Sequence, residues 1–418
     1  MALNNNFVKP QYDDGGFAAL PHTIKRLLTT EGPDNYNASA SVFEGLWQPY
    51  DAVIFFLIDG FGWRFFERFQ DCPFLQQIAT EGRVATLTSQ FPSTTAAHVT
   101  TIHTGLPPGQ SGVYEWQFYE PQLDALISPL LFSFAGTTKP DTLKATNIDP
   151  ATLYPTRTIY QDLQTQGIPS HLFQLKAITH STYSKIIYQG AKPSGYSTLP
   201  EALVNLQRLL AQQKSRSYYF LYFANIDSLS HEYGPSSPQV EAEIDTLLTT
   251  LDRLFLQKLK RQQPNVLFIM SADHGQVEVD PQTTIYLNLD PQFSGIHKFL
   301  KHNQQGQPII PAGSARDMFL YIKDDLLDEA QEFLAQRLTG KAEVHQVQSL
   351  IDQGFFGPPP ISDIFLSRVG NLVILPYAYE TVWWYEKGKF EQEFYGHHGG
   401  LTPQEMHIPL LVYNPRGM

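Results

Sequence analysis

Residues 51–62 read DAVIFFLIDGFG and carry the clearest structural signal in this chain. The run Ala52–Ile58 is apolar at nearly every position, ends in Asp59 and is followed by Gly60 and Gly62. Continuous rather than alternating hydrophobicity is typical of a strand that is buried on both faces, as in parallel α/β sheets. The stretch therefore predicts an internal strand of an α/β fold, with an acidic residue at its carboxyl end.

Two later segments repeat this pattern. SYYFLYFANID (217–227) leads into Asp227, and NVLFIMSADHG (265–275) leads into Asp273 and His274. In open α/β sheets, ligands bind at the carboxyl ends of the strands. We therefore expect the three aspartates to lie at one edge of the sheet, with helices over 200–213 and 240–260 between the strands.

The pattern of predicted strands and helices changes between about residue 283 and residue 394. RDMFLYIKDD, LLDEAQEFLAQRL and AEVHQVQSLI predict a small β-α-β unit, and GNLVILPYAYETVWWYEK predicts strands or a hairpin. We interpret 283–394 as an inserted, capping α+β subdomain, and 1–282 together with 395–418 as the catalytic core. Residues 117–144 are expected to form a loop over the site, and a short amphipathic helix is expected around His22–Leu28.

Composition limits the class of protein. The chain has 418 residues, 42% of them hydrophobic, which suffices for a sizeable core. Its net charge of -12 argues against a protein that coats nucleic acid, and a phosphate site would need positive charge from bound metal ions. The single cysteine, Cys72, fits a reducing compartment. Because the chain shows no signal peptide and no bilayer-length apolar run, we expect a cytoplasmic protein without membrane association.

The acidic strand ends have the residue types of a metal site. Asp227 and His231 are four apart, which on a helix places both on one face as half of a site for zinc or a similar ion. A solvated Asp–His pair is the alternative. Asp273 and His274 follow a buried strand, where an unpaired carboxylate is costly, although helix capping explains such an aspartate, and Asp59, equally well. Three strand-end aspartates, two of them with a histidine, favour metal binding.

Two further segments supply reactive and ligating groups. In FPSTTAAHVTTIHTG (91–105), three hydroxyl residues precede a predicted short helix, whose N-terminus favours an anion. Simple capping by Ser or Thr is the alternative. A threonine hydroxyl becomes a useful nucleophile when a metal lowers its pKa. FYGHHGG (394–400) adds two adjacent histidines, for which a solvated pair in a loop is the alternative.

Taken in order, LIDGFG, FPSTTAAHVTTIHTG, IDSLSHEYGP, SADHG and GHHGGLTPQEM resemble the alkaline phosphatase superfamily and, within it, the type I phosphodiesterase/nucleotide pyrophosphatase family. The motifs run from Asp59 to Pro409. The resemblance implies an α/β, alkaline-phosphatase-like sandwich with a central, mostly parallel sheet flanked by helices, plus the small insertion. It also implies a hydrolase that cleaves phosphodiester or nucleotide pyrophosphate bonds of small molecules through a phosphothreonine intermediate.

The resemblance also assigns residues. One metal ion would be held by Asp59, Asp273 and His274 and would contact the nucleophile, and the second by Asp227, His231 and His398. The family's nucleophile lies ten residues before the glycine of the TG pair, which gives Thr95, with Thr94 as the alternative. His397 would be a near-site residue. Where the family has an asparagine that holds a phosphoryl oxygen, this chain has His98, which would either donate the same hydrogen bond or add positive charge at low pH. This departure weakens the assignment to the diesterase branch but not the metal site.

Several points stay open. The two divalent ions are expected to be zinc, with manganese or iron as alternatives. A phosphomonoesterase, a phosphonate hydrolase, a metal-dependent phosphomutase and a non-catalytic protein on the same fold are the competing functions. Trp383, Trp384 and Tyr385 would either stack on a nucleobase or serve only packing. The oligomeric state is not predicted.

Overall fold

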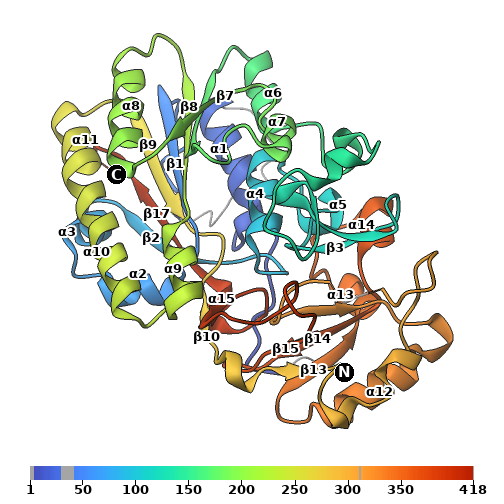
Figure 1. Ribbon diagram of the computed structural model, residues 1–418. Helices are drawn as coiled ribbons and strands as arrows, with labels where there is room; N and C mark the ends of the chain where they lie inside the picture. Colours follow the sequence, from blue (N-terminus) through green and yellow to red (C-terminus); the bar gives the residue numbers. More distant parts are fainter. Residues whose placement is uncertain (1–3, 30–41, 310–311, 418) are drawn as a thin grey trace.

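The computed structural model describes residues 4–29, 42–309 and 312–417 (Figure 1). A seven-stranded sheet runs through the larger part of the molecule in the order β2-β17-β9-β1-β8-β6-β7. Its strands are β1 (Ala52–Ile58), β2 (Arg83–Thr88), β6 (Ser170–Leu175), β7 (Ala191–Tyr196), β8 (Ser217–Phe223), β9 (Val266–Ser271) and β17 (His407–Tyr413). Strand β1 pairs in parallel with β8 and β9, and β17 is antiparallel to β9 and β2. The sheet is therefore mostly parallel, as predicted.

The three predicted internal strands lie side by side in the middle of this sheet. Every residue of β1, β8 and β9 is buried. Phe56 of β1 packs against Phe255 and Phe268, with ring centroids 4.8 and 5.1 Å apart. Burial on both faces explains why these strands are continuously apolar.

Helices cover both faces of the sheet (Figure 1). On one side lie α1 (Leu20–Thr29), α4 (Thr95–Thr104) and α6 (Ile159–Thr165), and on the other α3 (Pro73–Glu81), α8 (Leu199–Ala211) and α10 (Pro238–Leu251). The helices expected near 22–28 and 200–213 are thus present. The long helix expected over 240–260 is present as one continuous helical run over 238–262, in which a π-helical segment (Asp252–Leu256) lies between α10 and α11 (Gln257–Gln262).

The later part of the chain builds a second, smaller sheet, which lies at the lower right in Figure 1. It has the order β12-β14-β13 and is formed by β12 (Met318–Leu320), β13 (Ala342–Gln346) and β14 (Leu372–Pro376), with α12 (Leu327–Arg337) joining β12 to β13. The elements of the predicted β-α-β unit are present, but β14 lies between its two strands. Strand β15 (Val382–Trp383) pairs with β11 (Ile285–Tyr286), so 370–387 forms strands rather than a hairpin.

The smaller sheet has its own hydrophobic core, a cluster of buried side chains that runs from Leu287 to Phe390. This cluster falls inside the proposed insertion 283–394, whose boundaries stay a prediction. Among the described residues, no helix is both long and apolar enough to cross a bilayer.

The remaining elements are short. Residues 117–144 contain a small antiparallel sheet of β3 (Phe118–Glu120), β4 (Ala125–Ser128) and β5 (Ser133–Phe134). The others are α2 (Trp63–Phe69), α5 (Pro108–Ser111), α7 (Thr182–Ile187), α9 (Asn225–Tyr233), β10 (Val277–Glu278), α13 (Val347–Asp352), α14 (Asp363–Arg368), β16 (Gly396–His397) and α15 (Pro403–Met406).

Candidate active site

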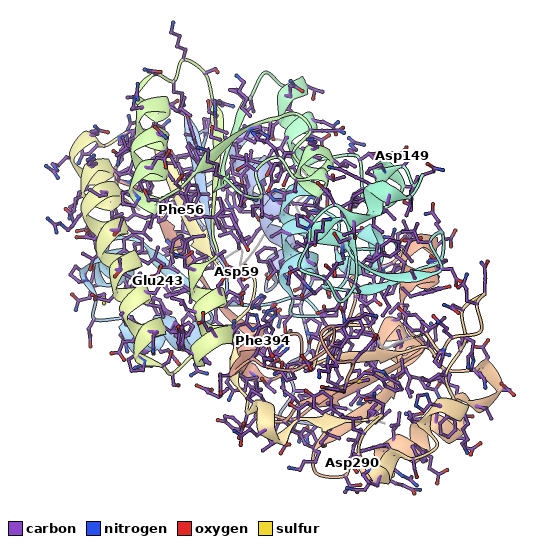
Figure 2. The ribbon with its side chains drawn as sticks, viewed as in Figure 1. Phe56, Asp59, Asp149, Glu243, Asp290 and Phe394 are labelled. Carbon is purple, nitrogen blue, oxygen red and sulfur yellow. The ribbon has the colours of Figure 1, made fainter. Side chains whose placement is uncertain are left out.

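Three aspartates meet at the carboxyl ends of β1, β8 and β9. Asp59 follows β1, Asp273 follows β9 after one residue, and Asp227 lies in the first turn of α9, just beyond β8. Gly60 links them: its amide donates to Asp273 Oδ1 (3.1 Å), its φ is +72°, and a Cβ there would lie 3.0 Å from Asp227 Cα. Glycine thus permits the positive φ and the close approach that bring the three side chains together. Figure 2 shows Asp59 near the centre of the molecule.

Asp59, Asp273 and His274 form the first cluster, and their ligand atoms all lie within 4.8 Å of one another. His274 Nδ1 is 3.0 Å from the Gly275 carbonyl, to which it donates, so its Nε2 carries a lone pair. That lone pair faces Asp59 Oδ1 (3.4 Å) and Asp273 Oδ2 (3.5 Å). Asp273 Oδ2 is buried without a hydrogen-bond partner among the described residues. Three converging lone pairs are repulsive by themselves and match the donor set of a divalent cation.

The second cluster surrounds Asp227. Its Oδ1 lies 3.4 Å from His231 Nε2 and 3.6 Å from His398 Nε2. The other ring nitrogens of these histidines, Nδ1, point at the carbonyls of Gly396 and Ser93, both at 2.8 Å. Such hydrogen bonds fix the tautomer and leave Nε2 free to ligate. The structure thus brings together all three residues of the expected second set.

The two clusters adjoin each other. The rings of His274 and His398 are stacked, with centroids 3.6 Å apart, and Asp227, His274 and His398 also have ligand atoms within 4.8 Å of one another. The site is therefore a single group of six side chains, in which His274 lies between the two sets.

The electrostatics of the site also suit bound cations. Burial, followed by the neighbouring Asp273 and Asp227 carboxylates, raises the pKa of Asp59 well above its usual range. Burial raises the pKa of Asp273 to about 6 and lowers that of His274 to about 3. Burial thus disfavours negative charge on Asp59 and Asp273, and cations beside these carboxylates would reverse that effect.

Thr95 is the hydroxyl residue that meets this site. It is the first residue of α4, and its Oγ1 lies 3.2 Å from His274 Nε2 and 3.5 Å from both Asp59 carboxylate oxygens. The preceding Thr94 makes no capping hydrogen bond with its side chain, which lies beside Glu115. The N-terminal amides of α4 are therefore not capped by Thr94, and Thr95, rather than Thr94, has the position of a nucleophile.

His98 is placed differently from the expectation. The side chain is fully buried, Nδ1 lies 2.7 Å from the Thr94 carbonyl, and Nε2 accepts from the Gln90 amide at 2.9 Å. Burial lowers its pKa to about 4. Since both ring nitrogens are engaged within the protein, this geometry does not support the expected hydrogen bond from His98 to a phosphoryl oxygen.

A pocket of about 790 Å³ opens beside Thr95, Asp227 and His398. Residues from 117–144 line it, including Ser128, Leu131 and 136–138, so that this segment does border the site as expected. Trp383 also lines the pocket, whereas Trp384 packs in the smaller core, 5.2 Å from the ring of His297. His397, the near-site residue, lines the pocket as well.

Sequence reasoning missed several residues of the site. The Tyr222 hydroxyl donates to Asp59, and Gln276 Nε2 donates to Asp227 Oδ1 at 2.5 Å. Glu115, Trp116 and Phe394 line the pocket. Gln276 follows the SADHG motif directly, Phe394 begins the segment FYGHHGG, and Tyr222 lies in SYYFLYFANID, so these three carry a local signal. Glu115 and Trp116 lie outside the quoted motifs.

Comparisons with known proteins agree with this geometry. The family model for type I phosphodiesterase/nucleotide pyrophosphatase matches residues 53–401. Murine ectonucleotide pyrophosphatase/phosphodiesterase 5, solved as an inactive variant in complex with AMP, is 19% identical with a TM-score of 0.63, over 87% of this chain and 88% of the other. The human counterpart is 17% identical with a TM-score of 0.62, over 86% and 87%. No curated protein sequence matches significantly.

The similar structures support the fold. The family model covers all three strand-end aspartates as well as the two glycines after His398. The chain therefore belongs to the type I phosphodiesterase/nucleotide pyrophosphatase family of hydrolases.

Proposed function

We propose that the protein hydrolyses phosphodiester or nucleotide pyrophosphate bonds through a phosphothreonine intermediate on Thr95. The observation that carries this proposal is the position of Thr95 Oγ1, 3.2 Å from His274 Nε2 at the N-terminus of α4. The murine relative was solved with AMP, and a nucleotide ester is accordingly the substrate class we propose for this chain.

The six-residue site suits two divalent ions, with zinc as the proposed metal and manganese or iron as alternatives. When bound, such ions supply Lewis-acid stabilisation of the attacking and leaving oxygens of an in-line displacement. Asp59, Asp273 and His274 would hold one ion, and Asp227, His231 and His398 the other.

The chain's own groups determine the course of the reaction. Thr95 Oγ1 attacks phosphorus, a P–Oγ bond forms, and the bond to the leaving oxygen breaks, while the proton of the Thr95 hydroxyl passes through water to that leaving oxygen. The N–H groups at the start of α4 face the phosphoryl oxygens and stabilise their charge. Water then cleaves the phosphothreonine and regenerates the hydroxyl, while the pocket beside Thr95 holds the ester group.

A comparison of bis-p-nitrophenyl phosphate with p-nitrophenyl phosphate tests this function in protein loaded with defined metals. We expect a clear preference for the diester and no turnover by Thr95→Ala. A preference for the monoester would identify a phosphomonoesterase. Phosphoryl transfer within a sugar phosphate, with little release of phosphate, would identify a phosphomutase.

We also propose a cytoplasmic location, on the ground that Cys72 is the only cysteine and is a free thiol. Fractionation of the native cells with antibodies against the chain tests this location.

A further inference from the structure

The pocket beside the candidate metal site is poor in positive charge. Among its described lining residues, Lys389 is the only lysine or arginine, whereas Glu115 and Glu391 add carboxylates to that of Asp227. Lys389 Nζ is itself 2.5 Å from Glu386 Oε1, so that part of its charge is already neutralised. Apart from metal-bound positions, the pocket thus offers little to attract an anion.

Arg316 and Arg64 do not supply the positive charge that the pocket lacks. Arg316 is fully buried, and its guanidinium donates to Glu405 and to backbone carbonyls. The Arg64 guanidinium donates to Glu278 and Ser236. Neither arginine lines the pocket.

Of the two glutamates that line the pocket, Glu115 is buried and Glu391 is exposed. Glu115 is buried near the equally buried Asp317, and burial raises the pKa of both carboxyl groups above their ordinary values, that of Glu115 to about 7. Glu115 Oε1 has no hydrogen-bond partner among the described residues. Above about pH 7, where Glu115 is ionised, its buried charge is poorly screened, and an anionic group that enters the pocket is repelled.

The walls of the pocket instead suit uncharged groups. Trp116 and Phe394 line it with 43% of their surface exposed each, and the Phe394 ring lies 4.4 Å from that of His231. Figure 2 shows Phe394 between Asp59 and the smaller sheet. Exposed aromatic faces beside a catalytic site bind apolar or planar groups.

We propose that this pocket selects substrates with a single phosphate group, namely diesters whose ester groups carry no second phosphate, and discriminates against nucleotides that bear another phosphate. The inference rests on the proposed function and narrows its substrate class. The carboxylates of Glu115 and Glu391 supply the discrimination, and the aromatic walls hold the ester group.

A matched pair of substrates tests this selectivity. The p-nitrophenyl ester of thymidine 5′-monophosphate and the same ester with an added 3′-phosphate share a nucleoside and a leaving group. We expect kcat/KM to be lower by at least about tenfold for the 3′-phosphorylated ester. Equal or higher kcat/KM for that ester would overturn the inference.

Charge reversal provides the matched variants. Glu391→Lys should narrow the ratio of the two kcat/KM values, because it replaces a carboxylate of the pocket with a cation. Glu393→Lys makes the same change at an exposed residue that does not line the pocket, and should leave the ratio unchanged. A ratio that responds equally to both changes, or to neither, would contradict a role for the pocket carboxylate.

Calorimetric binding keeps this inference separate from the proposed function. If neither ester is turned over, the proposed function fails, and binding of thymidine 5′-monophosphate and thymidine 3′,5′-bisphosphate to the metal-loaded protein still decides the inference. Tighter binding of the monophosphate supports it. Equal or tighter binding of the bisphosphate overturns it.

Discussion

The guanidinium of Arg316 and the carboxylate of Glu405 form a fully buried ion pair, with Nε 3.0 Å from Oε1 and Nη2 2.9 Å from Oε2. Glu405 also accepts from the amides of Gly400 (3.0 Å) and Thr402 (3.2 Å). The pair therefore ties the part of the chain that carries the smaller sheet to the loop that presents His398.

Glu405→Gln should destabilise the protein by about 3 kcal/mol, because it leaves the Arg316 charge buried without a counter-charge. Chemical denaturation measures the loss. Glu393→Gln, at an exposed site, is the control and should change stability by less than about 0.5 kcal/mol. A Glu405→Gln protein as stable as this control would show that the ion pair is not required.

Thr95→Ala should lower kcat by about four orders of magnitude or more, since it removes the proposed nucleophile. Its metal content should stay near that of the wild type. Thr94→Ala should retain most activity, because the hydroxyl that lies beside Asp59 and His274 is that of Thr95. Steady-state kinetics of both variants decide the assignment, and an inactive Thr94→Ala beside an active Thr95→Ala would reverse it.

His98→Ala should act mainly on stability. The substitution leaves the Gln90 amide without its buried partner and removes one of the two hydrogen bonds that the Thr94 carbonyl accepts from residue 98, at a cost of about 2 kcal/mol. Thermal unfolding should show a lower Tm, while KM for a diester changes little. A large rise in KM at unchanged stability would instead restore the direct substrate contact that we expected from the sequence.

Glu115 should make stability depend on pH. Burial raises its pKa to about 7 from an ordinary value of 4.5, so the folded protein binds its proton more tightly than the unfolded chain. The resulting stabilisation is fully present below pH 4.5 and is lost as pH rises through about 7. In chelator-treated protein, Glu115→Gln should flatten the fall of Tm over this range, and an unchanged slope would contradict the shift.

Much of this architecture could be predicted because its signals are local. Continuous apolar runs mark β1, β8 and β9, and the carboxyl ends of neighbouring parallel strands share an edge, which placed Asp59, Asp227 and Asp273 together. The spacing of Asp227 and His231 fits α9, whose residues 225–233 are helical as that spacing required.

The features of the fold and the site that could not be predicted depend on long-range contacts, which leave no local sequence pattern. Strand β14 lies between β12 and β13 in the sheet, although the sequence from β12 through α12 to β13 is typical of a complete β-α-β unit. The side chain of His98 turns into the core because Gln90 and Thr94 offer partners there, which the motif does not reveal. Tyr222 reaches Asp59 only because β8 and β1 pair in register.

The metal content of active protein tests the central claim most directly. Elemental analysis of freshly purified, active enzyme should find about two divalent ions per chain, as a two-metal site requires. Asp273→Asn should bind fewer ions and lose activity with them, because it removes an anionic ligand. Full activity in protein that contains no zinc, manganese, iron or similar ion would contradict the account.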